Sequence, residues 1–139
     1  MNKKIILIVD DVQFNHRTAN MVLQDTYELY NALSAEEAFN ILEKVRPDLI
    51  LLDVVMPVMD GYEMIKILKK SSQFKSIPVI FLTAETKAES EVEGFNCGIA
   101  DYITKPFTPI VMKKRVENQI ALAEYERSLE AKVEEKVEE

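Results

Sequence analysis

Four short apolar runs in this chain each end at a residue that can carry chemistry. The run IILIV is followed by Asp10 and Asp11, LILL by Asp53, PVIFL by Thr83, and DYIT by Lys105. These runs alternate with amphipathic stretches, which is typical of βα units that build a parallel sheet. Ligands of open parallel sheets bind in the crevice beyond the carboxyl ends of the strands. We therefore expect all five side chains to meet at one edge of a single sheet.

The pattern predicts a doubly wound α/β fold with a five-stranded parallel sheet and five helices. Nearly continuous Ile, Leu, Val and Phe in the first, third and fourth strands suit strands covered on both faces. The strands are expected at Lys4–Val9, Tyr27–Ala32, Leu49–Asp53, Pro78–Thr83 and Asp101–Thr104. The first four helices are expected at Gln13–Leu23, Ala35–Val45, Gly61–Lys70 and Ala88–Asn96.

Three helix ends carry recognisable signals. Ser34 with Glu37 forms a capping-box pattern at the second helix, and Asp60 is expected to cap the third. Gly98 follows the fourth helix, where a residue in the left-handed conformation would end it.

Composition limits the class of protein and its partners. At 139 residues, with 47% hydrophobic and 29% charged residues, the chain is one globular domain plus an additional segment. The net charge of −7 argues against sequence-independent binding of nucleic acid, which requires a basic face. Cys97 is the only cysteine, so no intrachain disulfide can form and a cytoplasmic location is expected. No apolar stretch approaches the roughly 20 residues of a membrane span, so no membrane partner is expected.

The aspartates predict a divalent cation site. Magnesium prefers oxygen ligands and is usually held by one or two carboxylates together with phosphate oxygens and water. Asp11 and Asp53 would ligate it directly, Asp10 would act through water, and the backbone carbonyl of Val55 would add a ligand. A bound cation would also offset the repulsion between adjacent aspartates. For a single residue such as Asp11, the alternative is simple capping of the first helix.

The same edge predicts phosphoryl transfer. Asp53 is the natural nucleophile, because an aspartate can form an acyl phosphate. Phosphoryl transfer needs mainly in-line positioning and charge neutralisation, and Lys105 supplies a cation. Pro106 makes a cis peptide bond available that would turn the chain sharply and aim the lysine inward. Thr83 would donate its hydroxyl to a phosphoryl oxygen, and the small Ala84 would leave room for the anion.

Three other residues have competing interpretations. The Tyr102 ring would swing between exposed and buried rotamers when Thr83 moves, or it is simply an aromatic at a sheet edge. His16, the only histidine, has no catalytic or metal-binding partner nearby in sequence and is expected to be structural or exposed. Cys97 is expected to be a small core residue rather than a reactive thiol.

The C-terminal helix is longer than a domain of this size requires. Thr108 and Pro109 provide a cap and a first helical residue, and no glycine or proline follows to the end of the chain. A stripe near helical spacing is formed by Leu122, Tyr125, Leu129, Val133 and Val137. It indicates a dimerising or linking coiled coil, or else a solvated single helix stabilised by Glu–Lys pairs.

These motifs resemble a known family. IILIVDDV, LILLDVVMPVMDGYEM, PVIFLTA and DYITKPF are similar, in order and spacing, to the four signatures of receiver domains in two-component response regulators. The resemblance covers about residues 4–123 and implies a flavodoxin-like sheet in strand order 2-1-3-4-5. It implies phosphoryl transfer from a sensor histidine kinase to Asp53. It identifies Asp10 and Asp11 with the acidic pair, Thr83 and Tyr102 with the switch residues, and Lys105 with the invariant lysine.

The resemblance also implies an output surface on the fourth helix, fifth strand and fifth helix, and we expect two copies to dimerise there on activation. Val55 and Glu85 would flank the route of the hydrolytic water, and the apolar Val55 predicts a long-lived phosphoryl group. Residues 1–123 would form the receiver domain. Residues 124–139 would be a helical extension, a coiled-coil linker to an output domain in a longer protein.

Two other functions are weaker. A phosphatase of the haloacid dehalogenase type, with Asp10 as nucleophile, requires a second aspartate where Val12 stands. A pseudo-receiver or scaffold would lack one of the acidic residues, Thr83 or Lys105, but all are present. The sequence therefore favours a signalling switch that catalyses its own phosphorylation and dephosphorylation.

Overall fold

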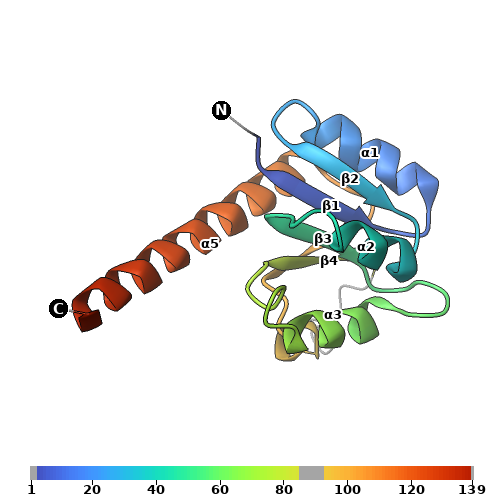
Figure 1. The fold of residues 1–139 in the computed structure, drawn as a ribbon. Coiled ribbons are helices and arrows are strands. Elements are labelled where there is room, and N and C mark those ends of the chain that lie inside the picture. Colours follow the sequence, from blue (N-terminus) through green and yellow to red (C-terminus); the bar gives the residue numbers. More distant parts are fainter. Residues whose placement is uncertain (1–2, 85–92, 139) are drawn as a thin grey trace.

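A computed structural model describes residues 3–84 and 93–138 of the chain, with side chains up to residue 132. A single parallel sheet has the strand order β2-β1-β3-β4-β5, as predicted (Figure 1). The strands are β1 (Ile5–Val9), β2 (Glu28–Ala32), β3 (Leu49–Asp53), β4 (Val79–Thr83) and β5 (Asp101–Thr104). The helices are α1 (Gln13–Leu23), α2 (Ala35–Leu42), α3 (Gly61–Lys70) and α5 (Pro109–Glu138).

The fourth predicted helix is only partly described. Residues 93–96 are helical, whereas the rest of the predicted segment, 88–92, lies outside the described residues. The chain then turns at Gly98, whose φ of +97° confirms the expected left-handed residue. Glu85 also lies outside the described residues.

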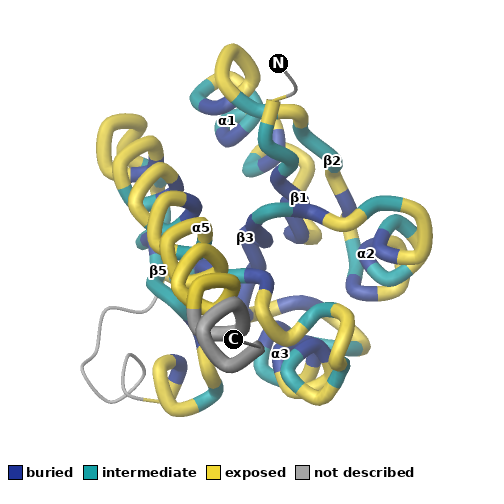
Figure 2. The backbone as a smooth tube through the Cα atoms, turned by 60° about the vertical axis from the view of Figure 1, so that its left-hand side comes forward, coloured by how far each residue is buried: buried dark blue, intermediate teal, exposed yellow. Residues whose placement is uncertain are grey.

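Alternating side chains of the central strands form two cores, one on each face of the sheet. One core packs beneath α2 and α3, and the other beneath α1 and α5 (Figures 1 and 2). In β1, for example, Leu7 and Val9 enter the first core while Ile6 and Ile8 enter the second. Burying a side chain of this size contributes about 1.5–3 kcal/mol, so this alternation fixes which face each helix covers.

The caps predicted for the second and third helices form, and one helix boundary is corrected. The Ser34 hydroxyl accepts from the Glu37 N–H at 3.1 Å, and Asp60 with Glu63 makes a reciprocal capping box. The second helix, expected to reach Val45, ends at Leu42. Its last turn tightens, because the Lys44 N–H donates to the Ile41 carbonyl at 3.0 Å before the chain reaches Pro47.

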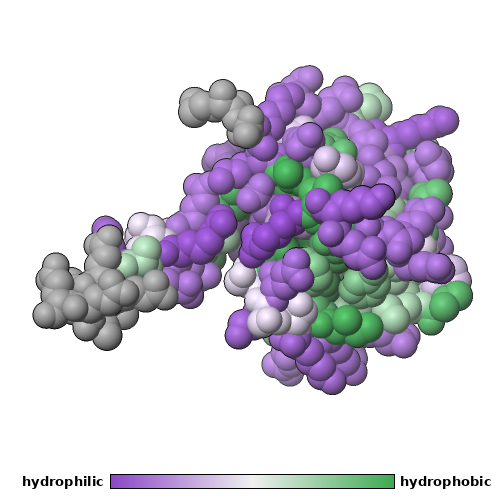
Figure 3. All heavy atoms as spheres, viewed as in Figure 1, coloured by the Kyte–Doolittle hydropathy of each residue, from purple (hydrophilic) through white to green (hydrophobic). Residues whose placement is uncertain are grey.

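Helix α5 leaves the body of the domain part-way along its length. Met112, Val116 and Ile120 are buried against the sheet, whereas Leu122, Tyr125 and Leu129 are exposed. We call residues 121–138 the projecting segment (Figure 1). On the face that Figure 3 shows, the described part of the projecting segment is mainly hydrophilic. None of the helices in the described part of the chain has the length and hydrophobicity needed to cross a lipid bilayer.

Candidate functional site

Parallel register brings the ends of four strands to one edge of the sheet. Val9 pairs with both Ala32 and Leu52, Asp53 pairs with Leu82, and Thr83 pairs with Thr104. The residues that follow or close these strands therefore lie together, as the apolar runs predicted. We call this group the carboxyl edge; its members are Asp10, Asp11, Asp53, Thr83 and Lys105.

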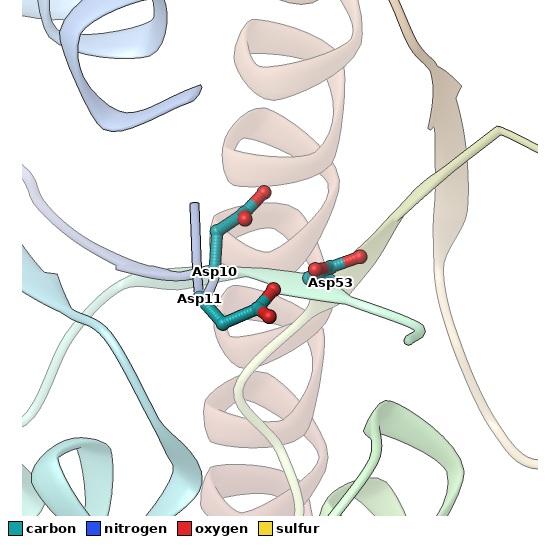
Figure 4. Close-up of side chains that lie close together, drawn as sticks. All are labelled: Asp10, Asp11 and Asp53. Carbon is teal, nitrogen blue, oxygen red and sulfur yellow. The ribbon is translucent and has the colours of Figure 1, made fainter. Parts of the chain in front are cut away.

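Three carboxylates of the carboxyl edge form a cluster. One oxygen from each of Asp10, Asp11 and Asp53 lies within 4.8 Å of the others. Figure 4 shows the Asp11 side chain extending from the end of β1 toward Asp53 at the end of β3. Asp10 and Asp53 are buried, and Asp11 is exposed. The cluster therefore opens to solvent on the side of Asp11.

The buried carboxylate of Asp10 is fully engaged. Its Oδ1 accepts from the Val12 N–H at 2.9 Å, and its Oδ2 accepts from the Asn15 amide at 3.0 Å. Lys105 Nζ lies 3.2 Å from the same Oδ2. A buried carboxylate needs such partners, because an unpaired buried charge is costly.

Lys105 joins two of the carboxylates. Its Nζ donates to Asp53 Oδ1 at 3.0 Å while also pairing with Asp10. Burial alone would lower the pKa of Lys105, but the attraction of Asp53 and Asp10 outweighs burial and raises it. The ammonium therefore stays charged. The Lys105–Pro106 peptide bond is cis, the conformation that Pro106 makes available.

Asp53 is buried without enough positive charge to keep it readily ionised. Burial, reinforced by the charge of Asp10, raises the pKa of Asp53 to about 6, against the opposing hydrogen bond from Lys105. A weaker contact comes from the Val55 N–H, 3.3 Å from Asp53 Oδ1. Gly61 packs against the backbone of Asp53, where only glycine fits, because a Cβ there would lie 2.6 Å from the Asp53 carbonyl oxygen.

The donor set fits a hard divalent cation. Three carboxylates with one open side provide several oxygen ligands and leave room for water and phosphate oxygens. Capping of α1 does not account for Asp11, because the N-cap residue is Val12 rather than Asp11. The side chain of Val55 is 72% exposed beside this cluster.

The predicted switch residues lie along β4 and β5. Thr83 is the half-buried last residue of β4, and its carbonyl accepts from the Lys105 N–H at 2.8 Å. Tyr102 pairs with Phe81 in the register, two residues before Thr83. The Tyr102 ring is half-buried, with its centroid 6.0 Å from that of Phe95.

Sequence reasoning missed the role of Arg115. Its guanidinium lies 5.1 Å from the Tyr102 ring centroid, pairs with Asp101 at 3.2 Å, and donates to the Tyr102 carbonyl. Arg115 thus ties α5 to the strand that carries Tyr102. An arginine in the first turns of a charged helix gives no sequence signal of such a contact.

Sequence reasoning also missed two neighbours of Asp10. Asn15 contacts the Asp10 carboxylate, and His16 contacts the Asp10 carbonyl at 2.7 Å. His16 is buried, with 3% of its surface exposed, which is consistent with the structural role expected of it. Spacing gave a partial signal, since both residues lie in the first turns of the helix that follows Asp11.

Comparison with known families gives a match over most of the chain. Residues 6–117 match the model of the response regulator receiver domain. A probable cyclic di-GMP phosphodiesterase of Vibrio cholerae serotype O1 is 41% identical over 115 residues, or 83% of this chain and 26% of that protein. The phosphate regulon transcriptional regulatory protein PhoB of Escherichia coli is 35% identical over 84% of this chain and 51% of its own length. The chain therefore spans only a quarter to a half of these curated relatives.

Solved structures agree with the family match. A putative response regulator from Chloroflexus aurantiacus is 35% identical and superposes with a TM-score of 0.82, covering 86% of this chain and 99% of that one. The chemotaxis response regulator CheY4 of Vibrio cholerae is also 35% identical, with a TM-score of 0.80 over 85% of this chain and 99% of its own. In both cases the matched region takes in almost the whole of the compared chain.

Proposed function

The chain belongs to the response regulator receiver domain family, and on that premise we propose that Asp53 accepts a phosphoryl group from a sensor kinase phosphohistidine. The observation that carries the proposal is Lys105, which contacts both Asp53 and Asp10 inside a cluster of three carboxylates. The phosphatase alternative is not favoured, because Val12 stands where a second aspartate is required and its side chain cannot donate or accept a proton.

The proposed reaction replaces the phosphorus–nitrogen bond of the phosphohistidine with a phosphorus–oxygen bond to Asp53. A carboxylate oxygen of Asp53 bonds to phosphorus as the phosphorus–nitrogen bond breaks, and the imidazole leaves with the electron pair and takes a proton from solvent. Lys105 neutralises charge on the phosphoryl oxygens, and the Thr83 hydroxyl donates to one of them. A Mg²⁺ ion, held by Asp11, Asp53 and the Val55 carbonyl with Asp10 through water, would supply further charge neutralisation.

The proposed output is a shift between two conformations. A phosphoryl group on Asp53 favours the state in which Thr83 moves toward the phosphate and Tyr102 turns inward. Arg115 supports this coupling, because its contacts with Asp101 and Tyr102 link β5 to α5. Movement of Tyr102 would then change the surface formed by the fourth helix, β5 and α5.

The proposed setting is a larger cytoplasmic signalling protein. Residues 1–123 form the receiver domain, and residues 124–139 form an extension that leads to an output domain or pairs with a second copy. The exposed stripe of Leu122, Tyr125 and Leu129 supports pairing, and the greater length of the curated relatives supports an output domain. The protein acts as a switch that catalyses its own phosphorylation and dephosphorylation, with no role for this domain in binding nucleic acid or membranes.

Intact mass after incubation with acetyl phosphate and Mg²⁺ tests the proposal. We expect the wild type to gain one phosphoryl group, and the gain to disappear with a chelator or in Asp53→Ala. Asp60→Ala is the matched control, because Asp60 caps α3 nearby without contacting the cluster. Equal labelling of Asp53→Ala and the wild type would overturn the assignment of Asp53.

A further inference from the structure

The backbone carbonyl of Asp10 is bonded by a buried histidine. His16 Nε2 lies 2.7 Å from this oxygen, and only 3% of the His16 surface is exposed. The neighbouring Asn15 bonds the Asp10 carboxylate instead, at 3.0 Å. Two successive residues of α1 therefore hold two different groups of one aspartate.

The other side of the His16 ring is fixed to strand β2. His16 Nδ1 lies 2.7 Å from Asn31 Oδ1. Asn31 precedes Ala32, whose carbonyl accepts from the Asp10 N–H at 3.1 Å. The contacts form a closed circuit from the Asp10 carbonyl through His16, Asn31 and Ala32 back to the Asp10 N–H, so Asp10 is held to β2 on both sides of its Cα atom.

This circuit controls the direction in which Asp11 leaves the strand. The Asp10 carbonyl and the Asp11 N–H belong to one planar peptide unit, so fixing the carbonyl fixes the orientation of that unit. Asp11 itself is exposed and lies at the open side of the carboxylate cluster. Its approach to Asp53 therefore depends on the peptide that His16 holds.

We propose that His16 is a positioning residue for the cation site, one that fixes the Asp10–Asp11 peptide so that the Asp11 carboxylate converges with Asp53. The inference rests on the proposed Mg²⁺ site and adds His16 as a residue that orients one of its ligands. Mutating a residue that hydrogen-bonds a metal ligand commonly lowers the metal affinity by about 10- to 100-fold. His16 acts one peptide away from a ligand, so the lower end of that range applies.

Isothermal titration of the full chain with Mg²⁺, without any phosphoryl donor, tests this role. His16→Leu removes both ring contacts at similar volume, and we expect the Mg²⁺ dissociation constant to rise by about tenfold. His16→Gln retains a donor that can reach the Asp10 carbonyl, and we expect an affinity within about threefold of wild type. Asn31→Ala removes only the support from β2, and we expect an intermediate loss.

Leu23→Ala separates positioning from stability. Leu23 is a buried residue of the same helix, far along it from the carboxylates, so its truncation should lower the melting temperature and leave Mg²⁺ affinity unchanged. Wild-type affinity in folded His16→Leu, or an equal loss in Leu23→Ala, would overturn the inference. If His16→Leu does not fold, unchanged affinity in Asn31→Ala would overturn it instead. A wild type that binds no Mg²⁺ would overturn the proposed cation site, and this inference with it.

Discussion

The carboxyl edge and the projecting segment differ in how tightly the rest of the chain constrains them. At the carboxyl edge, Asp10 is bonded through its N–H, its carbonyl and both carboxylate oxygens, and its partners come from α1, β2 and the end of β5. In the projecting segment, the described side chains are mostly exposed (Figure 2). One ion pair, between Lys4 and Glu124 at 2.5 Å, joins its base to the body.

At the carboxyl edge, the requirements of folding and of function oppose each other. Burial and the nearby charge of Asp10 raise the pKa of Asp53 at the carboxyl edge. This arrangement serves chemistry and lowers the stability of the folded protein. The described side chains of the projecting segment are mostly exposed, including Leu122, Tyr125 and Leu129, so we expect the segment to add little to the stability of the folded domain. Variants of both regions, and of the loop after β3, test this contrast.

Removing the Lys105 ammonium from the carboxyl edge should have the largest effect. Lys105→Met is expected to slow phosphorylation by acetyl phosphate by about 100-fold, because Lys105 joins two of the carboxylates and would neutralise the transferred group. The rate of mass gain at fixed donor and Mg²⁺ measures this. Lys114→Met, at an exposed site on α5, is the matched control and should react like wild type. Equal rates for both variants would show that Lys105 is not part of the reaction.

The cost of ionising the buried Asp53 carboxyl should be visible in the free energy of unfolding. Its pKa rises from 3.8 to about 6 on folding, so the folded protein binds a proton more tightly than the unfolded one. The folded state therefore loses stability as pH rises through this window. Without Mg²⁺, Asp53→Asn should raise the free energy of unfolding by about 1–2 kcal/mol at pH 8 and have little effect at pH 4. Urea titrations at both pH values measure the difference, and a pH-independent effect would contradict the cause given.

The residue beside Asp53 should set the lifetime of the phosphoryl group. Val55 exposes an apolar side chain at this point and offers no hydrogen bond to an attacking water. Val55→Asn is expected to speed dephosphorylation several-fold, because the amide can orient that water. Loss of the phosphorylated mass after removal of the donor gives the rate, and Val55→Ala should resemble wild type. Equal lifetimes for Val55→Asn and wild type would remove Val55 from this role.

The loop after β3 should also store strain. Val58 has a φ of +69° and a fully exposed side chain, and a β-branched residue is disfavoured in this conformation. Val58→Gly is therefore expected to raise the free energy of unfolding by about 1 kcal/mol, with the strain relief partly offset by a more flexible unfolded chain. Val55→Gly, in the same loop, should not stabilise the protein. Destabilisation by Val58→Gly would contradict the strain.

Removing the projecting segment should have the smallest effect. A chain ending at residue 123 keeps Met112, Val116 and Ile120 in the core, so its melting temperature at low concentration should stay within about 3 °C of the full chain. Val116→Ala, which opens a cavity in the core, should lower it much further. A large drop in melting temperature on truncation would show that the segment stabilises the folded domain, through contacts with that domain or with a second copy of the chain.

The sequence predicted what depends on local pattern. Strand order and convergence of the carboxyl edge follow from apolar runs and a family resemblance, and the ends of β3 and α3 lie where predicted. Contacts made across the fold were missed. Asn15 and His16 contact Asp10, and Arg115 contacts Tyr102, only once helices pack on the sheet. Position in the first turns of α1 was a partial signal for Asn15 and His16, and there was none for Arg115. The early end of α2 was missed because a tightened turn resembles a continuing helix in sequence.

The most direct test of the account is to locate the acyl phosphate. Wild-type protein phosphorylated with Mg²⁺ and acetyl phosphate would be reduced with borohydride, which converts a phosphorylated aspartate to homoserine, and then digested and sequenced by mass spectrometry. We expect homoserine at position 53 alone, and none when Mg²⁺ is removed by a chelator. Homoserine at position 10 or 11, or equal conversion with the chelator present, would contradict it.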